Sequence, residues 1–119
     1  ICKHMHEIST IQAKAVAIQL NKEVPYESPV KFDTDLTVLE NKVIIVVDDV
    51  LNTGRTFSYS LAPFLSIPVK KLQVAVLVDR NYRKFPIAAD YIGYELSTTI
   101  AEHVEVIISD PEKCGVYLH

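Results

Sequence analysis

Residues 43–56 read VIIVVDDVLNTGRT, and this stretch limits the fold of the chain more than any other. Its first five residues, Val43–Val47, form a continuous apolar run of the kind found in the central, buried strand of a parallel sheet. Two aspartates follow at once. A Thr-Gly-Arg-Thr turn then leads into Gly54–Leu65, which should be helical with a kink at Pro63. A strand that runs into a turn and a helix in this way is typical of an α/β fold.

The rest of the sequence predicts further strands and one long loop. Residues 1–9 resemble the end of a helix, and Thr10–Leu20 is apolar enough on both faces to predict a buried strand. Asn21–Asp35 has two prolines and many charges, and we expect a long surface loop, which in a compact domain is often functional. Further strands are expected at residues 72–78, 90–96, 104–109 and 115–118. This order predicts an α/β domain with a mainly parallel, twisted sheet flanked by helices.

Length and composition exclude several classes of protein. With 119 residues and a net charge of -3, we expect a single domain over residues 1–119, without a surface that attracts nucleic acid as a whole. The longest apolar runs contain about five residues, whereas a membrane span needs roughly 20. Cys2 and Cys114 make no disulfide framework, so a reducing cytoplasm is the expected compartment.

The aspartate pair and the turn suit a ribose phosphate. Ligands of open α/β sheets gather at the carboxyl ends of the strands, and a helix start offers N–H groups to a phosphate. Gly54 lets the backbone approach the phosphate closely, and Thr53 and Thr56 add hydroxyl donors. Asp48 and Asp49 can accept the two neighbouring hydroxyls of ribose, at ~1.5–3 kcal/mol for each charged hydrogen bond. We therefore expect this stretch to hold a ribose by its diol and its 5′-phosphate.

The same stretch resembles the phosphoribosyl-pyrophosphate (PRPP) signature of the type I phosphoribosyltransferases: four apolar residues, two acids, two apolar residues, any residue, then Thr-Gly-any-Thr. The resemblance implies transfer of a phosphoribosyl group from PRPP, which carries Mg²⁺, to a nitrogenous base. It implies that Asp48 and Asp49 hold the ribose diol in the catalytic site. It also implies that the 5′-phosphate is bound by Asn52, Thr53, Gly54, Arg55 and Thr56.

The loop Asn21–Asp35 occupies the place of the lid that closes over PRPP in this family. Lys22 is the basic residue of this loop that we would test for contact with pyrophosphate. A solvated loop lysine is an equally good interpretation.

A second stretch, Ala75–Leu96, resembles the bifunctional pyrimidine-operon attenuator/uracil phosphoribosyltransferase family, through Val-Asp-Arg, a basic loop, Pro-Ile and Ala-Asp-Tyr. This resemblance implies a pyrimidine substrate such as uracil in nucleotide salvage. Asp79 and Arg80 are the candidates for base recognition, although a strand-end Asp79 paired with Arg80 or Arg83 is an equal alternative. Hypoxanthine-type enzymes have a lysine in place of Asp79 and commonly an aspartate in place of Asn52, so a purine is the weaker option.

RNA binding is the alternative from another functional class. Three cations and a tyrosine lie within Arg80–Lys84, and this region binds messenger RNA in the attenuator family. Here Tyr82 replaces the usual histidine, and Ala88 and Tyr94 replace usual basic residues. With the acidic balance of the chain, these replacements lead us to expect that RNA is not a partner.

Type I phosphoribosyltransferases also have a strand and a second glycine loop, which binds pyrophosphate, before the helix that corresponds to residues 1–9 of this chain. Residues 1–20 match neither. We expect that this N-terminal part is missing from the sequence and that the intact protein is longer. The alternative is a non-catalytic module that binds a ribose phosphate. Homodimers or larger homo-oligomers are usual in families of this kind, and we expect one here.

Overall fold

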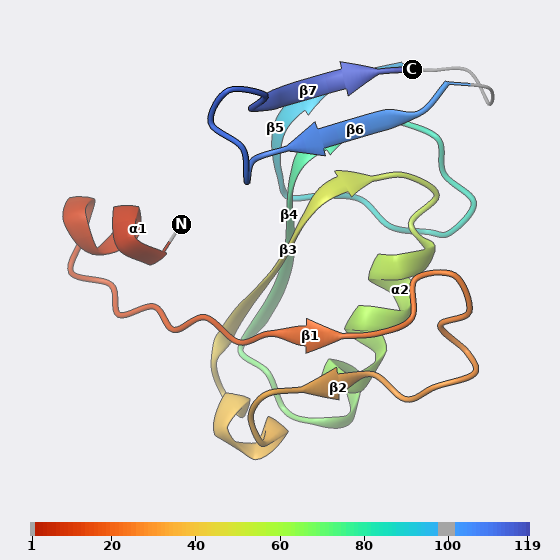
Figure 1. Cartoon of the computed structure of the whole chain (residues 1–119). Coiled ribbons are helices and arrows are strands. Elements are labelled where there is room, and N and C mark those ends of the chain that lie inside the picture. Colours follow the sequence, from red (N-terminus) through yellow and green to blue (C-terminus); the bar gives the residue numbers. More distant parts are fainter. Residues whose placement is uncertain (1, 98–101) are drawn as a thin grey trace.

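The computed structural model describes residues 2–97 and 102–119 of the chain. At its centre is a sheet of three parallel strands in the order β3 (Val43–Leu51), β4 (Lys71–Asp79) and β5 (Tyr91–Glu95). The register places Val47 opposite Ala75, and Ala75 opposite Tyr91. The α/β fold with a mainly parallel sheet, expected from the sequence, is confirmed (Figure 1).

One helical segment covers the inner face of this sheet. It begins as the α-helix α2 (Arg55–Leu61) and continues as the 3-10 helix η2 (Ala62–Ser66). The change at Pro63 was expected, because proline has no N–H for an α-helical hydrogen bond. Helix and sheet enclose a core of six buried side chains, Val46, Leu51, Phe57, Phe64, Val74 and Val76. This layer holds the turn between β3 and α2 in place.

The segment before β3 is mostly irregular. The predicted strand at Thr10–Leu20 is wrong except for β1 (Ile18–Gln19), which pairs antiparallel with β2 (Lys31–Phe32). The alanine-rich part of this stretch has little preference for strands, and its side chains are largely exposed. The short 3-10 helix η1 (Leu36–Leu39) follows β2, so that Asn21–Asp35 is a loop as predicted, apart from β2 itself.

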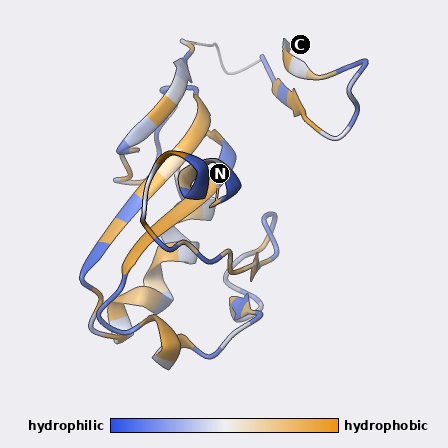
Figure 2. Cartoon of the chain, turned by 90° about the vertical axis from the view of Figure 1, so that its left-hand side faces the viewer, coloured by the Kyte–Doolittle hydropathy of each residue, from blue (hydrophilic) through white to orange (hydrophobic). Residues whose placement is uncertain are grey.

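The outer face of the sheet is apolar and exposed. Side chains alternate along a strand, so one face carries a set that is at least 39% exposed: Val43, Ile45, Val47, Leu77 and Tyr91. The helix α1 (Cys2–Ile8), expected from the sequence, lies on this side, opposite α2, and leaves these side chains exposed (Figures 1 and 2). The prediction that Val43–Val47 is a central strand is wrong, because β3 lies at one edge of the described sheet and β4 in its middle.

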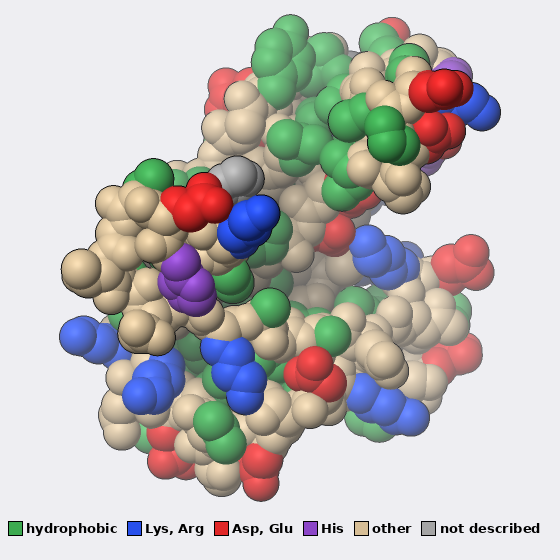
Figure 3. Space-filling view, turned by 60° about the vertical axis from the view of Figure 1, so that its left-hand side comes forward, with side chains coloured by type: hydrophobic (Ala, Val, Ile, Leu, Met, Phe, Trp, Pro, Cys, Tyr) green, Lys and Arg blue, Asp and Glu red, His purple; other side chains and the backbone are tan. Residues whose placement is uncertain are grey.

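The last two strands stand apart from the parallel sheet. β6 (Val104–Ile107) and β7 (Gly115–Leu118) exist as predicted, but they pair with each other as an antiparallel hairpin. Figure 3 shows a notch between the upper part of the molecule, which holds this hairpin, and the rest. Within the described residues, no helix has the length and apolar character needed to cross a membrane.

Candidate functional site

Asp48 and Asp49 lie inside β3, which continues through both residues to Leu51. As neighbours in a strand, their side chains leave on opposite faces of the sheet. Asp48 lies on the α2 side with its side chain 24% exposed, and its two carboxylate oxygens accept hydrogen bonds from Lys22 Nζ at 3.1 and 3.3 Å. Asp49 is exposed on the outer face. The two carboxylates therefore face opposite sides of the sheet, and their joint contact with one ribose stays a prediction.

Two concave surfaces meet at these aspartates. A pocket of about 190 Å³ on the α2 side offers charged and hydroxyl groups from Lys22, Asp48, Thr56 and Ser60. An open depression of about 730 Å³ on the outer side has a mainly apolar lining that includes Asp49, Leu77, Tyr91, Ile92 and Ile108. The first surface suits a sugar phosphate, and the second, with its aromatic ring, suits a planar base.

The sequence did not single out Tyr91 or Ile108 as parts of a site. Tyr91 lies within the Ala-Asp-Tyr motif, which was a signal for it. Ile108 comes to the depression only through the position of the segment after β6, which no local pattern reveals.

The five residues expected at the 5′-phosphate form the tight turn after β3, residues 52–54, and the start of α2, residues 55 and 56. Gly54 has a φ of 86°, in the left-handed region that favours glycine. A Cβ atom at this position would lie 3.2 Å from Ile87 Cβ and 3.3 Å from the Phe85 carbonyl oxygen. The Thr53 hydroxyl accepts a hydrogen bond from the Arg55 backbone N–H at 3.3 Å, which tightens the turn further. The structure thus brings these residues together, and their contact with phosphate stays a prediction.

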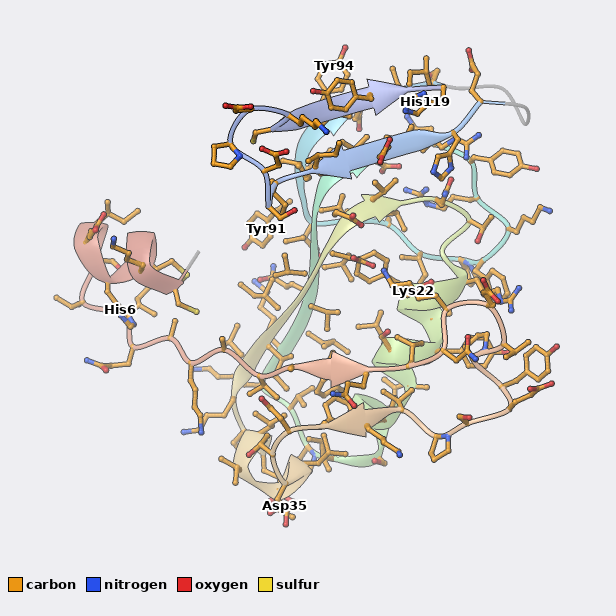
Figure 4. All side chains as sticks on the ribbon, in the orientation of Figure 1. His6, Lys22, Asp35, Tyr91, Tyr94 and His119 are labelled. Atoms are coloured by element: carbon orange, nitrogen blue, oxygen red, sulfur yellow. The ribbon has the colours of Figure 1, made fainter. Side chains whose placement is uncertain are left out.

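The predicted lid loop contacts this turn. Lys22 projects toward the end of β3, where it pairs with the Asp48 carboxylate (Figure 4). The Arg55 guanidinium donates a hydrogen bond to the Glu23 carbonyl oxygen and lies 6.0 Å from the centre of the Tyr26 ring. The loop therefore lies against the two groups that the sequence assigned to ribose and phosphate.

Both ends of the same loop are fixed by local hydrogen bonds. At its start, the Asn21 side-chain oxygen accepts bonds from the backbone N–H groups of Glu23 and Val24 at 3.0 and 3.3 Å. At its end, Asp35 caps η1 by accepting the backbone N–H and the hydroxyl of Thr37, each at 3.0 Å. These bonds, the backbone one first, hold the pKa of Asp35 below its ordinary value. The loop is thus anchored at both ends of its length.

Asp79 and Arg80 are buried, at 4% and 6% exposure, and both are bonded within the protein. One Asp79 carboxylate oxygen accepts a hydrogen bond from Arg83 Nη2 at 2.5 Å, which is the pairing given above as the alternative. Arg80 donates to the Asn52 side-chain oxygen at 2.8 Å and to the Glu102 carbonyl oxygen at 2.5 Å. Both residues support the phosphate turn, and their contact with a base stays a prediction.

The cations considered for RNA binding are largely engaged in the fold. Arg80 is buried and Arg83 is half-buried, whereas Lys84 is exposed. The Tyr82 ring has the Arg80 guanidinium at 5.5 Å and Lys84 Nζ at 5.7 Å from its centre. This arrangement leaves one of the three cations in solvent.

In the part of the chain that the structure describes, no group of three or more His, Cys, Asp or Glu side chains is arranged to hold a metal ion. The carboxylates at the site are Asp48 and Asp49, and the first of them is already paired with Lys22.

Known proteins share this sequence pattern. The model of the phosphoribosyl transferase domain family matches residues 6–110. The curated protein "Bifunctional protein PyrR" of Macrococcus caseolyticus is 39% identical over 90 residues, which cover 74% of this chain and 50% of that protein. The protein of the same name from Clostridium kluyveri is 46% identical over 78 residues, which cover 65% of this chain and 44% of that protein. The chain spans about half the length of the curated relatives it matches.

Solved structures share the fold. A hypoxanthine-guanine phosphoribosyltransferase from Bacillus anthracis aligns with a TM-score of 0.54 and 26% identity, over 66% of this chain and 46% of that one. A hypoxanthine phosphoribosyltransferase from Staphylococcus aureus also aligns with a TM-score of 0.54 and 26% identity, over 71% of this chain and 47% of that one.

Both comparisons agree with the resemblance found in the sequence, and the curated relatives match the group that Ala75–Leu96 indicated. The family match covers Asp48 and Asp49, the glycine turn, and the hydrogen bonds that Asp79 and Arg80 make within the protein. The chain belongs to the phosphoribosyl transferase domain family.

Proposed function

We propose that this protein is a PRPP-dependent phosphoribosyltransferase that acts on a pyrimidine base, most simply uracil, in nucleotide salvage. One observation carries the proposal: an aspartate pair and a left-handed glycine turn lie together at the carboxyl edge of a parallel sheet. This edge is where open α/β sheets bind their ligands. In the proposed complex, residues 52–56 bind the 5′-phosphate, and Asp48 and Asp49 bind the ribose hydroxyls.

The proposed reaction forms a bond between a base nitrogen and C1′ of the ribose while the bond from C1′ to the pyrophosphate oxygen breaks. Positive charge develops on the sugar ring in between. The Asp48 and Asp49 carboxylates are negative groups next to that charge and would stabilise it electrostatically. Lys22 forms an ion pair with Asp48 and is exposed on its other side. It is therefore our candidate for a contact with the leaving pyrophosphate.

Mg²⁺ enters this proposal with PRPP as part of the substrate. Oxygen ligands are what Mg²⁺ prefers, and pyrophosphate supplies them in full, so that the ion offsets the charge of the leaving group. We expect PRPP to hold the ion without a direct ligand from the protein.

Base preference is the part of the proposal that a binding measurement tests most directly. We expect UMP to bind more tightly than IMP or GMP, because Asp79 and Asn52 stand in place of two groups that a 6-oxopurine would use. A mismatched base leaves buried polar atoms unpaired, at ~1–3 kcal/mol each. Titration calorimetry with the three nucleotides measures the difference, and the Asp49→Asn variant serves as a control for ribose contact. Tighter binding of IMP or GMP would show that the base is a purine.

We further propose that the protein forms a homodimer or larger homo-oligomer in a reducing cytoplasm. Free Cys2 and Cys114 support the compartment. Self-association is supported by the part of the outer face around Val43 and Ile45, an exposed apolar patch of the kind that marks interaction sites, which lies outside the depression proposed for the base.

A charge on the outer face should disrupt that assembly. We expect Ile45→Glu to run as a monomer in size-exclusion chromatography with light scattering, because burying an unpaired carboxylate in an apolar contact is unfavourable. Leu65→Glu is the matched control, since Leu65 is 78% exposed on η2, on the other side of the sheet. If Ile45→Glu keeps the mass of the wild-type protein, the assembly uses a different surface.

A further inference from the structure

We propose that Arg83 is a positioning residue that sets the geometry of the phosphate turn. This inference rests on the proposed function, because it assumes that residues 52–56 bind the 5′-phosphate. Its basis is the guanidinium of Arg83, whose three nitrogens all donate hydrogen bonds to different segments. Nε donates to the Ile87 carbonyl at 2.9 Å, Nη1 to the Asn52 carbonyl at 2.7 Å, and Nη2 to the Asp79 carboxylate at 2.5 Å.

These bonds join the three segments that surround the turn. Asn52 follows the end of β3, Asp79 is the last residue of β4, and Ile87 belongs to the loop that leads to β5. The Asp79 side chain is 5% exposed and that of Arg83 is 24% exposed, so the ion pair is shielded from water. Charged hydrogen bonds in such surroundings are stronger than hydrogen bonds between neutral groups.

Backbone bonds extend the same support along the turn. The Thr53 carbonyl accepts hydrogen bonds from the backbone N–H groups of Lys84 and Phe85, at 2.9 and 3.0 Å. Ile87, held by Arg83 Nε, and Phe85 are the residues that a side chain at Gly54 would meet. The loop that carries Arg83 is therefore the back wall of the turn.

This wall determines which way the turn presents its donors. In a trans peptide, the carbonyl of one residue and the N–H of the next point in opposite directions. The carbonyls of Asn52 and Thr53 point toward Arg83 and the two residues after it. The N–H groups of Thr53 and Gly54 consequently point away from this wall. A phosphate on that side meets two aligned donors, and Arg83 orients the first peptide without touching the ligand.

Arginine suits this role and lysine does not. The guanidinium is a planar fork with five donors in fixed directions, whereas an ammonium group is a compact charge that cannot reach three acceptors spread over three segments. The charge of Arg83 is also balanced internally by Asp79, which argues for a structural bond and against a contact with an outside anion.

The test compares UMP with uridine, which differ only in the 5′-phosphate. Calorimetry on the 119-residue chain should show that the wild type binds UMP more tightly than uridine. In Arg83→Gln we expect the ratio of the two affinities to fall at least tenfold, with the affinity for uridine unchanged. Lys84→Gln removes the same charge from the neighbouring exposed residue, and its ratio should match the wild type. Arg83→Lys keeps the charge, and we expect its ratio of UMP to uridine affinity to fall as well. This variant tests the inference if Arg83→Gln does not fold.

The outcomes separate the two proposals. A wild-type protein that does not prefer UMP to uridine would overturn the proposed function, and this inference with it. A wild-type preference that persists in both Arg83 variants would overturn the positioning role alone. Equal weakening of UMP and uridine, together with a lower melting temperature, would show that Arg83 contributes only to general stability, which also contradicts the inference.

Discussion

Replacing Gly54 with valine should abolish binding of UMP to this protein. The residue has a φ of 86°, which costs an ordinary L-residue roughly 1–2 kcal/mol and a β-branched residue more. The new Cβ would also lie 3.2 Å from Ile87 Cβ, so that the turn or its back wall must move. Both effects displace the donors that face the phosphate. Calorimetry with UMP measures the loss.

Gly115→Val is the matched control for this experiment. A Cβ atom at Gly115 would meet the Tyr117 ring at 3.4 Å, an ordinary contact, and Gly115 lies in β7, away from the turn. We expect this variant to bind UMP like the wild type. Circular dichroism of both variants shows whether the fold is retained. A folded Gly54→Val protein with unchanged affinity for UMP would mean that the turn does not bind phosphate.

The second large effect concerns turnover. We expect the 119-residue chain to bind UMP and yet to release pyrophosphate from PRPP and uracil at a rate near background. Its sequence has three glycines, and none precedes Gly54, so residues 1–53 contain no second glycine loop to hold pyrophosphate. Losing one donor to a developing anion typically costs 10²–10³-fold in rate, and a loop supplies several. A coupled assay for pyrophosphate measures the rate.

The positive control for this assay is the hypoxanthine-guanine phosphoribosyltransferase of Bacillus anthracis, with hypoxanthine as the base. Asp49→Asn in this chain gives the baseline without one carboxylate. Rapid release of pyrophosphate by the wild-type chain that is lost in Asp49→Asn would show that the pyrophosphate site lies within these residues. Failure to bind UMP would instead contradict the ribose-phosphate site itself, and with it the alternative that the chain is a non-catalytic binding module.

The sequence predicts the elements that depend on local patterns. The apolar runs of β3 and β4, the glycine turn at Gly54 and the proline in η2 each carry a signal within a few residues. The family signature includes the same turn, which is why the residues expected at the 5′-phosphate lie together in the fold. The strand predicted at Thr10–Leu20 fails for the opposite reason. In the described structure most of this stretch has no neighbouring strand to pair with, and its apolar composition did not reveal that.

Other features depend on contacts between distant segments. β3 continues through two charged residues because Asp48 and Val50 pair with Val76 and Val78 of β4, and this pairing sends the two carboxylates to opposite faces. The bonds of Arg83 join residues that are up to 32 positions apart. A motif shows that such residues are present, and only the fold shows whether they face a ligand or each other.

Under the proposed self-association, the exposed outer face would link the stability of this protein to its concentration. Denaturant sensitivity and the heat capacity of unfolding both scale with the surface that becomes exposed on unfolding. A monomer that already exposes the outer face has less surface left to expose, so we expect its unfolding transition to be broad and of low cooperativity. When a second copy covers that face, folding and association become a single equilibrium. The midpoint of unfolding then depends on the protein concentration as well as on the sequence.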